Sequence, residues 1–241
     1  MFRLKIAFLI LTKNEEHSIT KLITELTEQA NLLHLKPFEI IVVDDSTDQT
    51  AIKAQASQAT VFRAENLGLG AAYKFGLEKC LEKNPEFIIS LDGDGQVETA
   101  ELRAFYEPLN KGYDLVIGSR FKTSNLIDYP YPKINLFGSK ILSLYLSYMT
   151  GQNLTDSHGG FRAMKSAVAQ NSLLSCKHTY IQETIIEAAE ADFKILEIPS
   201  AWKLRKVGKS KVVASIPRYV RKVGPMLFKR LVHKTIFGQS R

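Results

Sequence analysis

The stretch IISLDGDGQ, residues 88–96, joins an apolar run to two carboxylates, Asp92 and Asp94, and to the amide of Gln96. An apolar run of this length bounded by glycine is typical of a buried strand. In an open α/β sheet, ligands bind just beyond the carboxyl ends of the strands. Two carboxylates held close together there do not both stay ionised without a cation. The stretch therefore predicts a site for a hard divalent ion, Mg2+ or Mn2+, with a diphosphate as its other ligand, although an Asp-Gly turn is the plainer alternative.

Strand-like and helix-like segments alternate around this stretch. We expect strands at residues 5–11, 38–43, 60–64, 87–91 and 113–118, and helices at residues 18–35, 50–59, 69–82 and 100–109. This alternation predicts an α/β fold with a mostly parallel sheet flanked by helices. After residue 120 the rhythm changes, and we expect a loop over 121–132, a helix over 133–150, a polar turn over 156–162 followed by a helix, a helix over 180–191 and a strand over 194–198.

Polar side chains follow several of the predicted strands. Asp44 or Asp45 can bind the ring N–H of a nucleobase or a ribose hydroxyl, whereas Ser46 and Asp48 are suited to capping the next helix. The small-residue turn at 66–70 allows close approach of the backbone to a ligand, and the helix that follows it favours phosphate.

Three charged residues farther along the chain have both functional and structural interpretations. Arg120 ends a predicted strand and can bind a phosphate with both arms of its guanidinium, or it is a surface arginine. Glu183 opens a predicted helix, where the helix dipole favours it, or it points into the site. His158 fits a loop histidine better than a catalyst.

The charge of the chain is unevenly placed. Twelve of the 32 Lys and Arg residues and none of the 25 Asp and Glu residues lie from Lys203 onward, so an acidic body precedes a basic tail. Such a tail calls for an anionic partner, either nucleic acid or anionic lipid. In the tail, apolar residues are spaced by three to five positions with Lys and Arg between them, which predicts a basic amphipathic helix at a membrane interface, broken near Gly224-Pro225. A helix packed on the core or on a second copy is the alternative.

Other features of the sequence bear on the cellular compartment of the protein. The two cysteines, Cys80 and Cys176, have no metal-ligand or redox spacing, which predicts free thiols in a reducing compartment. Only six apolar residues follow Arg3 and Lys5, and no cleavage site follows them, so we expect no secretory signal. The apolar-leaning stretch at 141–149 is half the length that a transmembrane helix needs.

Together these motifs resemble the family 2 inverting glycosyltransferases with the nucleotide-diphospho-sugar transferase (GT-A) fold. Within that family the chain looks like the polyprenyl-phosphate sugar transferases of the dolichyl-phosphate mannosyltransferase group, over roughly residues 4–212. The matching segments, in the family's order, are residues 11–15, 44–45, 66–70, 92–96, 119–121, 156–162, 182–183 and 205–211.

The resemblance implies a role for each matching residue. The implied nucleotide-sugar ligands are Leu11, Lys13, Asn14, Glu15, Asp44, Asp45, Asn66, Gly68, Gly70, Asp92 and Gly93; the metal ligands are Asp92, Asp94 and Gln96; the acceptor-phosphate ligands are Arg120, Lys133, Arg205 and Lys211; and the catalytic residues are Asp94, Arg120 and Glu183. Leu11 and Lys13 replace the usual Pro and Tyr of the first motif, which leaves a UDP and a GDP donor both open. Gly159 replaces the usual Ser, and Lys133 stands where the family often has Arg.

Two enzymatic hypotheses follow, with one from another class. In the first, a divalent metal supports inverting transfer of a sugar from a UDP- or GDP-sugar to a polyprenyl phosphate, such as dolichyl or undecaprenyl phosphate. In the second, the acceptor is a hydroxyl of a polysaccharide or glycolipid and Glu183 is its general base. The third, a nucleic-acid-binding module that uses the tail, is disfavoured by the acidic body.

The first hypothesis sets the expected organisation. Residues 1–212 form the GT-A domain and residues 213–241 form the basic amphipathic helix or helices. The protein is expected to be cytoplasmic and peripheral on the inner face of the membrane, held through its C-terminal helix to anionic lipid. A membrane protein that supplies the missing transmembrane helices is a further expected partner, and nucleic acid is not.

Overall fold

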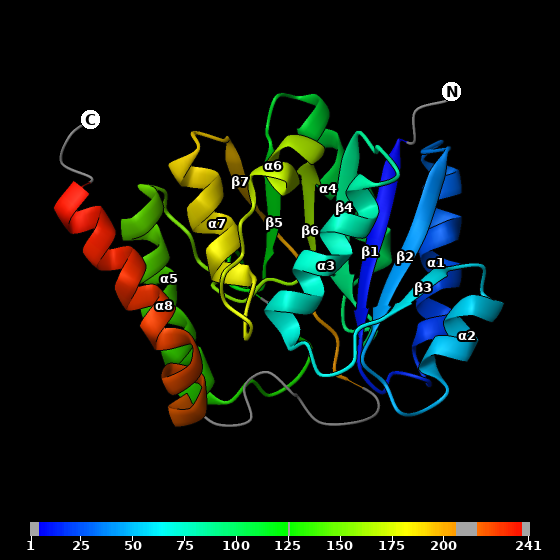
Figure 1. The fold of residues 1–241 in the computed structure, drawn as a ribbon, viewed down its shortest axis with the longest axis horizontal. Coiled ribbons are helices and arrows are strands. Elements are labelled where there is room, and N and C mark those ends of the chain that lie inside the picture. The colour runs from blue at the N-terminus through cyan, green and yellow to red at the C-terminus, as the bar shows by residue number, and fades with distance from the viewer. Residues whose placement is uncertain (1–4, 125, 206–215, 238–241) are drawn as a thin grey trace.

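The computed structural model describes residues 5–124, 126–205 and 216–237. A seven-stranded sheet with the order β3-β2-β1-β4-β6-β5-β7 runs through the molecule, with helices on both faces (Figure 1). The strands are β1 (Ile6–Thr12), β2 (Phe38–Asp44), β3 (Thr60–Arg63), β4 (Phe87–Asp92), β5 (Leu115–Ser119), β6 (Arg162–Lys165) and β7 (Ile195–Pro199). The helices are α1 (Ile19–Leu32), α2 (Thr50–Ala56), α3 (Leu69–Leu81), the 3-10 helix η1 (Thr99–Glu101), α4 (Leu102–Asn110), α5 (Lys133–Thr150), α6 (Ser166–Asn171), α7 (Ile181–Glu190) and α8 (Ile216–Phe237).

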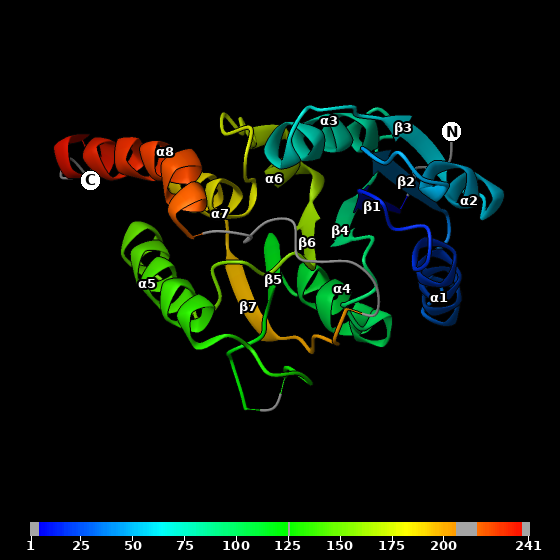
Figure 2. The same ribbon diagram turned by 90° about the horizontal axis from the view of Figure 1, so that it is seen from below.

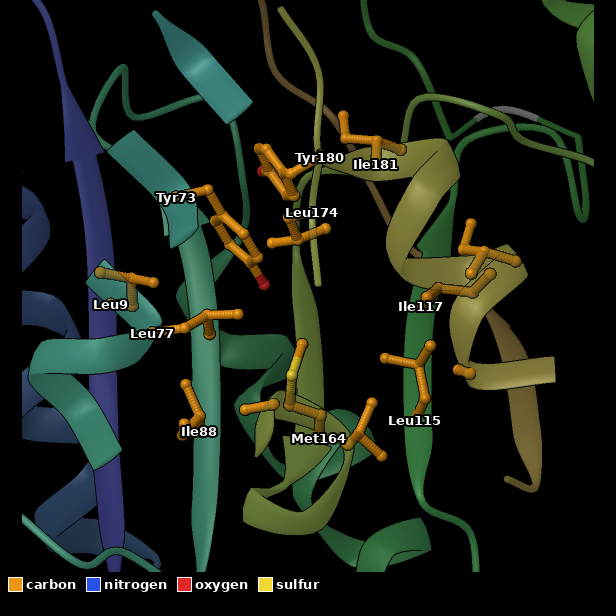
Figure 3. Packing of buried hydrophobic residues seen from close by; sticks show 14 of the residues in the cluster. Leu9, Tyr73, Leu77, Ile88, Leu115, Ile117, Met164, Leu174, Tyr180 and Ile181 are labelled. Atoms are coloured by element: carbon orange, nitrogen blue, oxygen red, sulfur yellow. The ribbon is translucent and has the colours of Figure 1, made fainter. Parts of the chain in front are cut away.

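The central strands are apolar throughout because both faces of the sheet are covered. Along β1, Ile6, Phe8 and Ile10 pack with α1, α2 and α4, whereas Leu9 and the other alternate residues pack with α3, α5, α6 and α7. Figure 3 shows part of this second layer, with Leu9 on β1, Ile88 on β4, and Tyr73 and Leu77 on α3. Burying a side chain such as Leu or Ile stabilises the fold by about 1.5–3 kcal/mol, so these strands anchor the loops at their ends.

The mostly parallel sheet is confirmed, with one exception that the sequence pattern missed. Residues 162–165, expected to be the end of the polar turn and the start of a helix, form β6, which pairs antiparallel with both β4 and β5. The strand has only four residues and begins at a charged side chain, Arg162, so it lacks the apolar run that identified the other strands. The helix predicted after the turn exists as the short α6.

The C-terminal residues form one helix, α8, that packs on the body. Figure 1 shows α8 beside α5, and Val223 of α8 is buried. The Tyr145 hydroxyl of α5 donates to the Leu227 carbonyl at 2.8 Å. Lys234 donates to the carbonyls of Tyr148 and Met149 at 2.9 and 2.6 Å, satisfying two acceptors at the C-terminus of α5.

An arginine of α8 also ties it to α7. Arg230 pairs with Glu190 at 2.8 Å, with Glu187 at 2.5 Å and with the fully buried Glu183 at 3.4 Å. The predicted break at Gly224-Pro225 is wrong, since α8 runs through Pro225, whose ring lies on the exposed side of the helix. Among the described helices, none combines the length and hydropathy required to cross a bilayer.

The glycine turn before α3 packs against protein. Gly70 donates its N–H to the Lys177 carbonyl at 3.0 Å. A Cβ atom at Gly70 would lie 1.9 Å from the Cys176 carbonyl oxygen and 2.5 Å from that of Thr179, and one at Gly68 would lie 2.6 Å from the Lys177 carbonyl oxygen. The small residues of this turn therefore admit the backbone of residues 176–179, where the sequence had indicated close approach to a ligand.

A matched pair of alanine substitutions tests this close approach. Gly70→Ala forces the turn away from residues 176–179 and should lower the free energy of unfolding by about 2 kcal/mol or more. Gly138→Ala in α5 places a methyl group that meets no described residue within 4 Å, and it should raise the free energy of unfolding by about 0.5–1 kcal/mol. Urea unfolding followed by circular dichroism measures both, and equal stability of the two variants would contradict the packing described.

Candidate functional site

The predicted motifs meet at one edge of the sheet because the strands that carry them run parallel and in register. Thr12, near the end of β1, is opposite Asp44 of β2, and Leu11 is opposite Asp92 of β4. Figure 2 views the molecule from the side of this edge. The carboxyl ends of adjacent parallel strands are the usual ligand-binding position in open α/β sheets.

The two acids at the end of β2 have different environments. Asp44 is fully buried and accepts hydrogen bonds from the Thr12 hydroxyl at 2.7 Å, from Ser46 and from Arg63. Its oxygens are thus used within the protein, where they join the ends of β1, β2 and β3. A structural role suits Asp44 better than the ligand role implied by the resemblance.

Asp45 is the acid of this pair that faces outward. Its side chain is 22% exposed, pairs with the half-exposed Lys13 at 2.5 Å, and accepts the backbone N–H of Asn66 at 2.9 Å. Burial would raise the pKa of Asp45, but the bonds from Lys13 and Asn66 outweigh it, so the pKa lies below its usual range. An ionised Asp45 beside an ammonium group offers an acceptor and a donor to a nucleobase edge.

Asn14 and Glu15 organise the turn after β1. Asn14 has φ of 54°, donates its N–H to the Ser46 hydroxyl at 2.7 Å and accepts the Thr47 N–H at 2.9 Å. The buried Glu15 pairs with Arg205. This pair places a residue that follows β7 by only a few positions at the end of β1, inside the predicted nucleotide site.

The paired carboxylates lie at the end of β4, as the sequence predicted. Burial and the charge of Asp94 raise the pKa of Asp92 to about 7, against the opposing charges of Arg162 and Arg205. A Cβ atom at Gly160 would lie 2.7 Å from an oxygen of Asp92, so glycine at that position keeps space open beside the carboxylate.

These carboxylates suit a divalent cation. The described residues include no group of three or more His, Cys, Asp or Glu that could hold a metal ion. A metal site here would consist of the carboxylate pair, with diphosphate or water at the other positions. That donor set fits Mg2+ or Mn2+, which are bound through one or two carboxylates together with substrate phosphates. Asp92 and Asp94 remain the predicted ligands.

The third predicted ligand, Gln96, connects this motif to the C-terminal side of the chain. Its side-chain amide donates to the Lys203 carbonyl at 2.9 Å, and its backbone carbonyl accepts the Lys203 N–H at 2.8 Å. Arg205 follows two residues later, with its guanidinium 3.9 Å from Asp94. The amide of Gln96 thus serves in positioning Arg205, and its ligand role stays a prediction.

Arg120, which was expected to bind a phosphate through two nitrogens of its guanidinium, instead binds a carboxylate of the protein. Its Nε and one terminal nitrogen bind the two oxygens of Asp156 at 2.7 and 2.8 Å, deep in the protein. The same guanidinium lies 4.8 Å from the Trp202 ring centre, and its second terminal nitrogen is 3.5 Å from the Tyr131 hydroxyl. The fork is unsuited to a phosphate in this arrangement because Asp156 occupies it.

The structure says less about the two lysines that were predicted to bind the acceptor phosphate. Lys133 is exposed at the first residue of α5. Lys211 lies outside the described residues, as does the boundary expected between residues 212 and 213. Both lysines stay predictions as acceptor-phosphate ligands.

Glu183, the base of the second hypothesis, is fully buried. Its carboxylate accepts the Ser175 hydroxyl at 2.6 Å and the Cys176 N–H at 2.9 Å, besides its pairing with Arg230. A general base has to reach the proton that it removes. These contacts support a structural role, in which Glu183 holds the segment that packs on Gly68 and Gly70.

Two arginines at this edge had no role in the site predicted from the sequence, although one of them, Arg162, lies in a matching segment. Arg63 ends β3 and binds Asp44, and its position at the end of a predicted strand was a usable signal. Arg162 is fully buried, donates to the carbonyls of Gly159 and Ile181 at 2.8 and 3.0 Å, and has one terminal nitrogen without a hydrogen-bond partner among the described residues. Its charge acts on Asp92, a relation that depends on the unexpected strand β6.

A pH experiment tests the environment of Asp92. A buried carboxyl with a raised pKa costs stability when it ionises, so the metal-free Asp92→Asn variant should be more stable than wild type above pH 7, by on the order of 1–4 kcal/mol. The difference should disappear as the pH falls toward the ordinary carboxyl pKa near 4. Thermal unfolding in EDTA measures it. Adding Mn2+ at pH 8 should stabilise wild type but not the variant, and a pH-independent difference would contradict this assignment.

Comparison with known proteins agrees with this geometry. The family described as Glycosyl transferase family 2 matches residues 7–173. The chain is 25% identical over 220 residues to the polyprenol monophosphomannose synthase of Mycolicibacterium smegmatis, covering 86% of this chain and 80% of the relative. It is 29% identical over 190 residues to the undecaprenyl-phosphate mannosyltransferase of Micrococcus luteus, covering 74% and 77%.

A solved structure supports the fold. Glucosyl-3-phosphoglycerate synthase from Mycobacterium tuberculosis, in complex with Mn2+, UDP and phosphoglyceric acid, matches with a TM-score of 0.68 at 18% identity, covering 94% of this chain and 78% of that one. The expected GT-A architecture is therefore confirmed. The chain is a glycosyltransferase and belongs to glycosyl transferase family 2.

Proposed function

We propose that this protein transfers a sugar, with inversion and with a divalent metal, from a UDP- or GDP-sugar to a polyprenyl phosphate. The observation that carries the proposal is the carboxylate pair Asp92 and Asp94 at the same sheet edge as Asp45, with Arg205 beside it. The edge thus offers groups for a base, a metal-bound diphosphate and a second phosphate. The names of the two relatives, which refer to polyprenol and undecaprenyl phosphate, support this acceptor class.

A bound Mg2+ or Mn2+ would neutralise the charge that develops on the leaving diphosphate. Asp92 and Asp94 would hold the ion, and Asp45 with Lys13 would orient the nucleobase. Arg205, fixed by Glu15 and 3.9 Å from Asp94, lies where a cation can steer an acceptor phosphate toward the donor. Positioning and fixed charge of this kind lower a barrier without a proton transfer.

The acceptor phosphate needs no base. A phosphate monoester has a second pKa near 6, so its attacking oxygen is already an anion at neutral pH. This chemistry agrees with a site in which Glu183 is engaged by Ser175 and Cys176. A hydroxyl acceptor would need a carboxylate with access to the acceptor, and the contacts of Glu183 do not favour that role.

The acceptor also implies a location. A polyprenyl phosphate resides in the membrane, so the enzyme acts at the cytoplasmic membrane face, with its basic C-terminal helix attracted to anionic lipid. A separate membrane protein that completes the assembly remains part of this proposal.

The reaction can be tested directly. Purified protein with Mn2+, a polyprenyl phosphate in detergent and a panel of radiolabelled UDP- and GDP-sugars should give lipid-extractable label from one donor, lost with EDTA. Asp94→Asn should lower the rate at least about 100-fold, whereas Glu28→Gln, which removes an exposed carboxylate on α1, should leave it unchanged. Donor binding without label in lipid would contradict the polyprenyl acceptor.

Glu183→Gln distinguishes the two acceptor classes. With a phosphate acceptor, transfer by folded variant protein should stay within about threefold of wild type, because no proton is removed by Glu183. With a hydroxyl acceptor, loss of a general base should cost roughly 100-fold or more. The far-ultraviolet circular dichroism spectrum and the melting temperature provide the control for folding, and comparison at equal amounts of folded protein gives the result.

A further inference from the structure

We propose that α5, together with the outer side of α8, forms a surface that docks on an anionic lipid bilayer, with α5 as the inserting helix. The inference rests on the proposed function for its purpose, since a lipid-linked acceptor requires contact with a membrane. It adds α5, which the sequence had not singled out, to the C-terminal helix that the sequence had predicted to contact the membrane.

The first observation is an apolar stripe along α5. Five large apolar side chains recur at helical spacing and are exposed: Ile134, Phe137, Ile141, Leu144 and Tyr148. Leu144 is 71% and Phe137 is 62% exposed. The residues of α5 that pack on the body, such as Leu142 and Leu146, occupy the opposite side of the helix. The helix therefore has two apolar sides, and one of them faces away from the protein.

The second observation is that exposed large apolar side chains are concentrated on α5 and α8. Of the fourteen exposed large apolar residues in the described part of the chain, nine lie on α5 and α8. Those on α8 are Val220, Phe228, Val232 and Ile236. The inner side of α8 is already committed, through Val223, Arg230 and Lys234, to α5 and α7. Exposed apolar side chains concentrated on two helices that contact each other mark an interaction site.

The charge of α5 and α8 indicates which kind of partner this surface binds. The 40 residues of α5 and α8 include eight Lys or Arg and no Asp or Glu, although the chain up to residue 202 is acidic. Exposed basic residues on these helices include Lys140, Arg221, Lys222 and Lys229. Apolar side chains flanked by cations, without acids, match a membrane interface with anionic headgroups. Protein interfaces are instead depleted in lysine.

The position of α5 and α8 agrees with the proposed function. Both helices begin at the sheet edge that carries Asp92, as Figure 1 shows, and they lie side by side in Figure 2 as well. A bilayer in contact with the two helices would border the site from which a lipid phosphate has to be reached. The tail supplies attraction through its charge, and α5 supplies apolar insertion.

Matched substitutions test the surface. Binding of full-length protein to vesicles of phosphatidylcholine and phosphatidylglycerol, without polyprenyl phosphate or donor, is measured by cosedimentation. Phe137→Glu and Leu144→Glu should each weaken binding about tenfold or more, and Leu144→Ala roughly fivefold. Leu32→Glu changes an equally exposed leucine on α1 (68% exposed) and introduces the same charge, so it should have little effect.

The outcomes separate this inference from the proposed function. The α5 variants should retain wild-type sugar transfer in detergent, where docking is not needed. If wild type binds vesicles through the apolar stripe of α5 but transfers no sugar, only the proposed function is overturned. Vesicle binding that is absent, or unchanged in the α5 variants, would overturn the docking surface. So would a wild-type dimer in light scattering that Leu144→Glu converts to a monomer while vesicle binding is unchanged.

Discussion

The site depends on one constraint, the shared register of β1, β2 and β4. Each strand is mostly apolar and ends in a polar residue, Thr12, Asp44 or Asp92, at the same edge of the sheet. Parallel pairing brings Asp44 level with Thr12, and Asp92 level with Leu11. A one-residue slip in any of these strands would turn its side chains toward the opposite face of the sheet and would separate the groups of the site.

Sequence patterns were sufficient for the elements built from long apolar runs. The bounds expected for α5 agree with the structure, and β1, β2 and β4 differ from expectation by a residue at one or both ends. The paired carboxylates were found for the same reason, because they directly follow such a run. Strand β6 was missed, since four residues that begin with Arg162 have no periodic pattern to detect.

Contacts between distant segments could not be predicted from the sequence. The pairing of Arg120 with Asp156, and of Arg205 with Glu15, joins residues with unrelated local patterns. The glycine turn illustrates the same difficulty, because glycine admits a ligand or a neighbouring backbone equally well, and only the fold reveals residues 176–179 beside it. Role assignment therefore depends on tertiary packing even where the motif is recognised.

The position of Arg230 alters the meaning of the C-terminal helix. Glu187 binds the N–H groups of Leu173 and Leu174, Glu183 binds that of Cys176, and both carboxylates share the cation of Arg230. Removal of α8 would leave two buried acids without their counter-charge, and such a loss is costly to a fold. The basic helix α8 is thus an integral part of the body of the protein, and forms of this enzyme without it would differ in their internal charge balance.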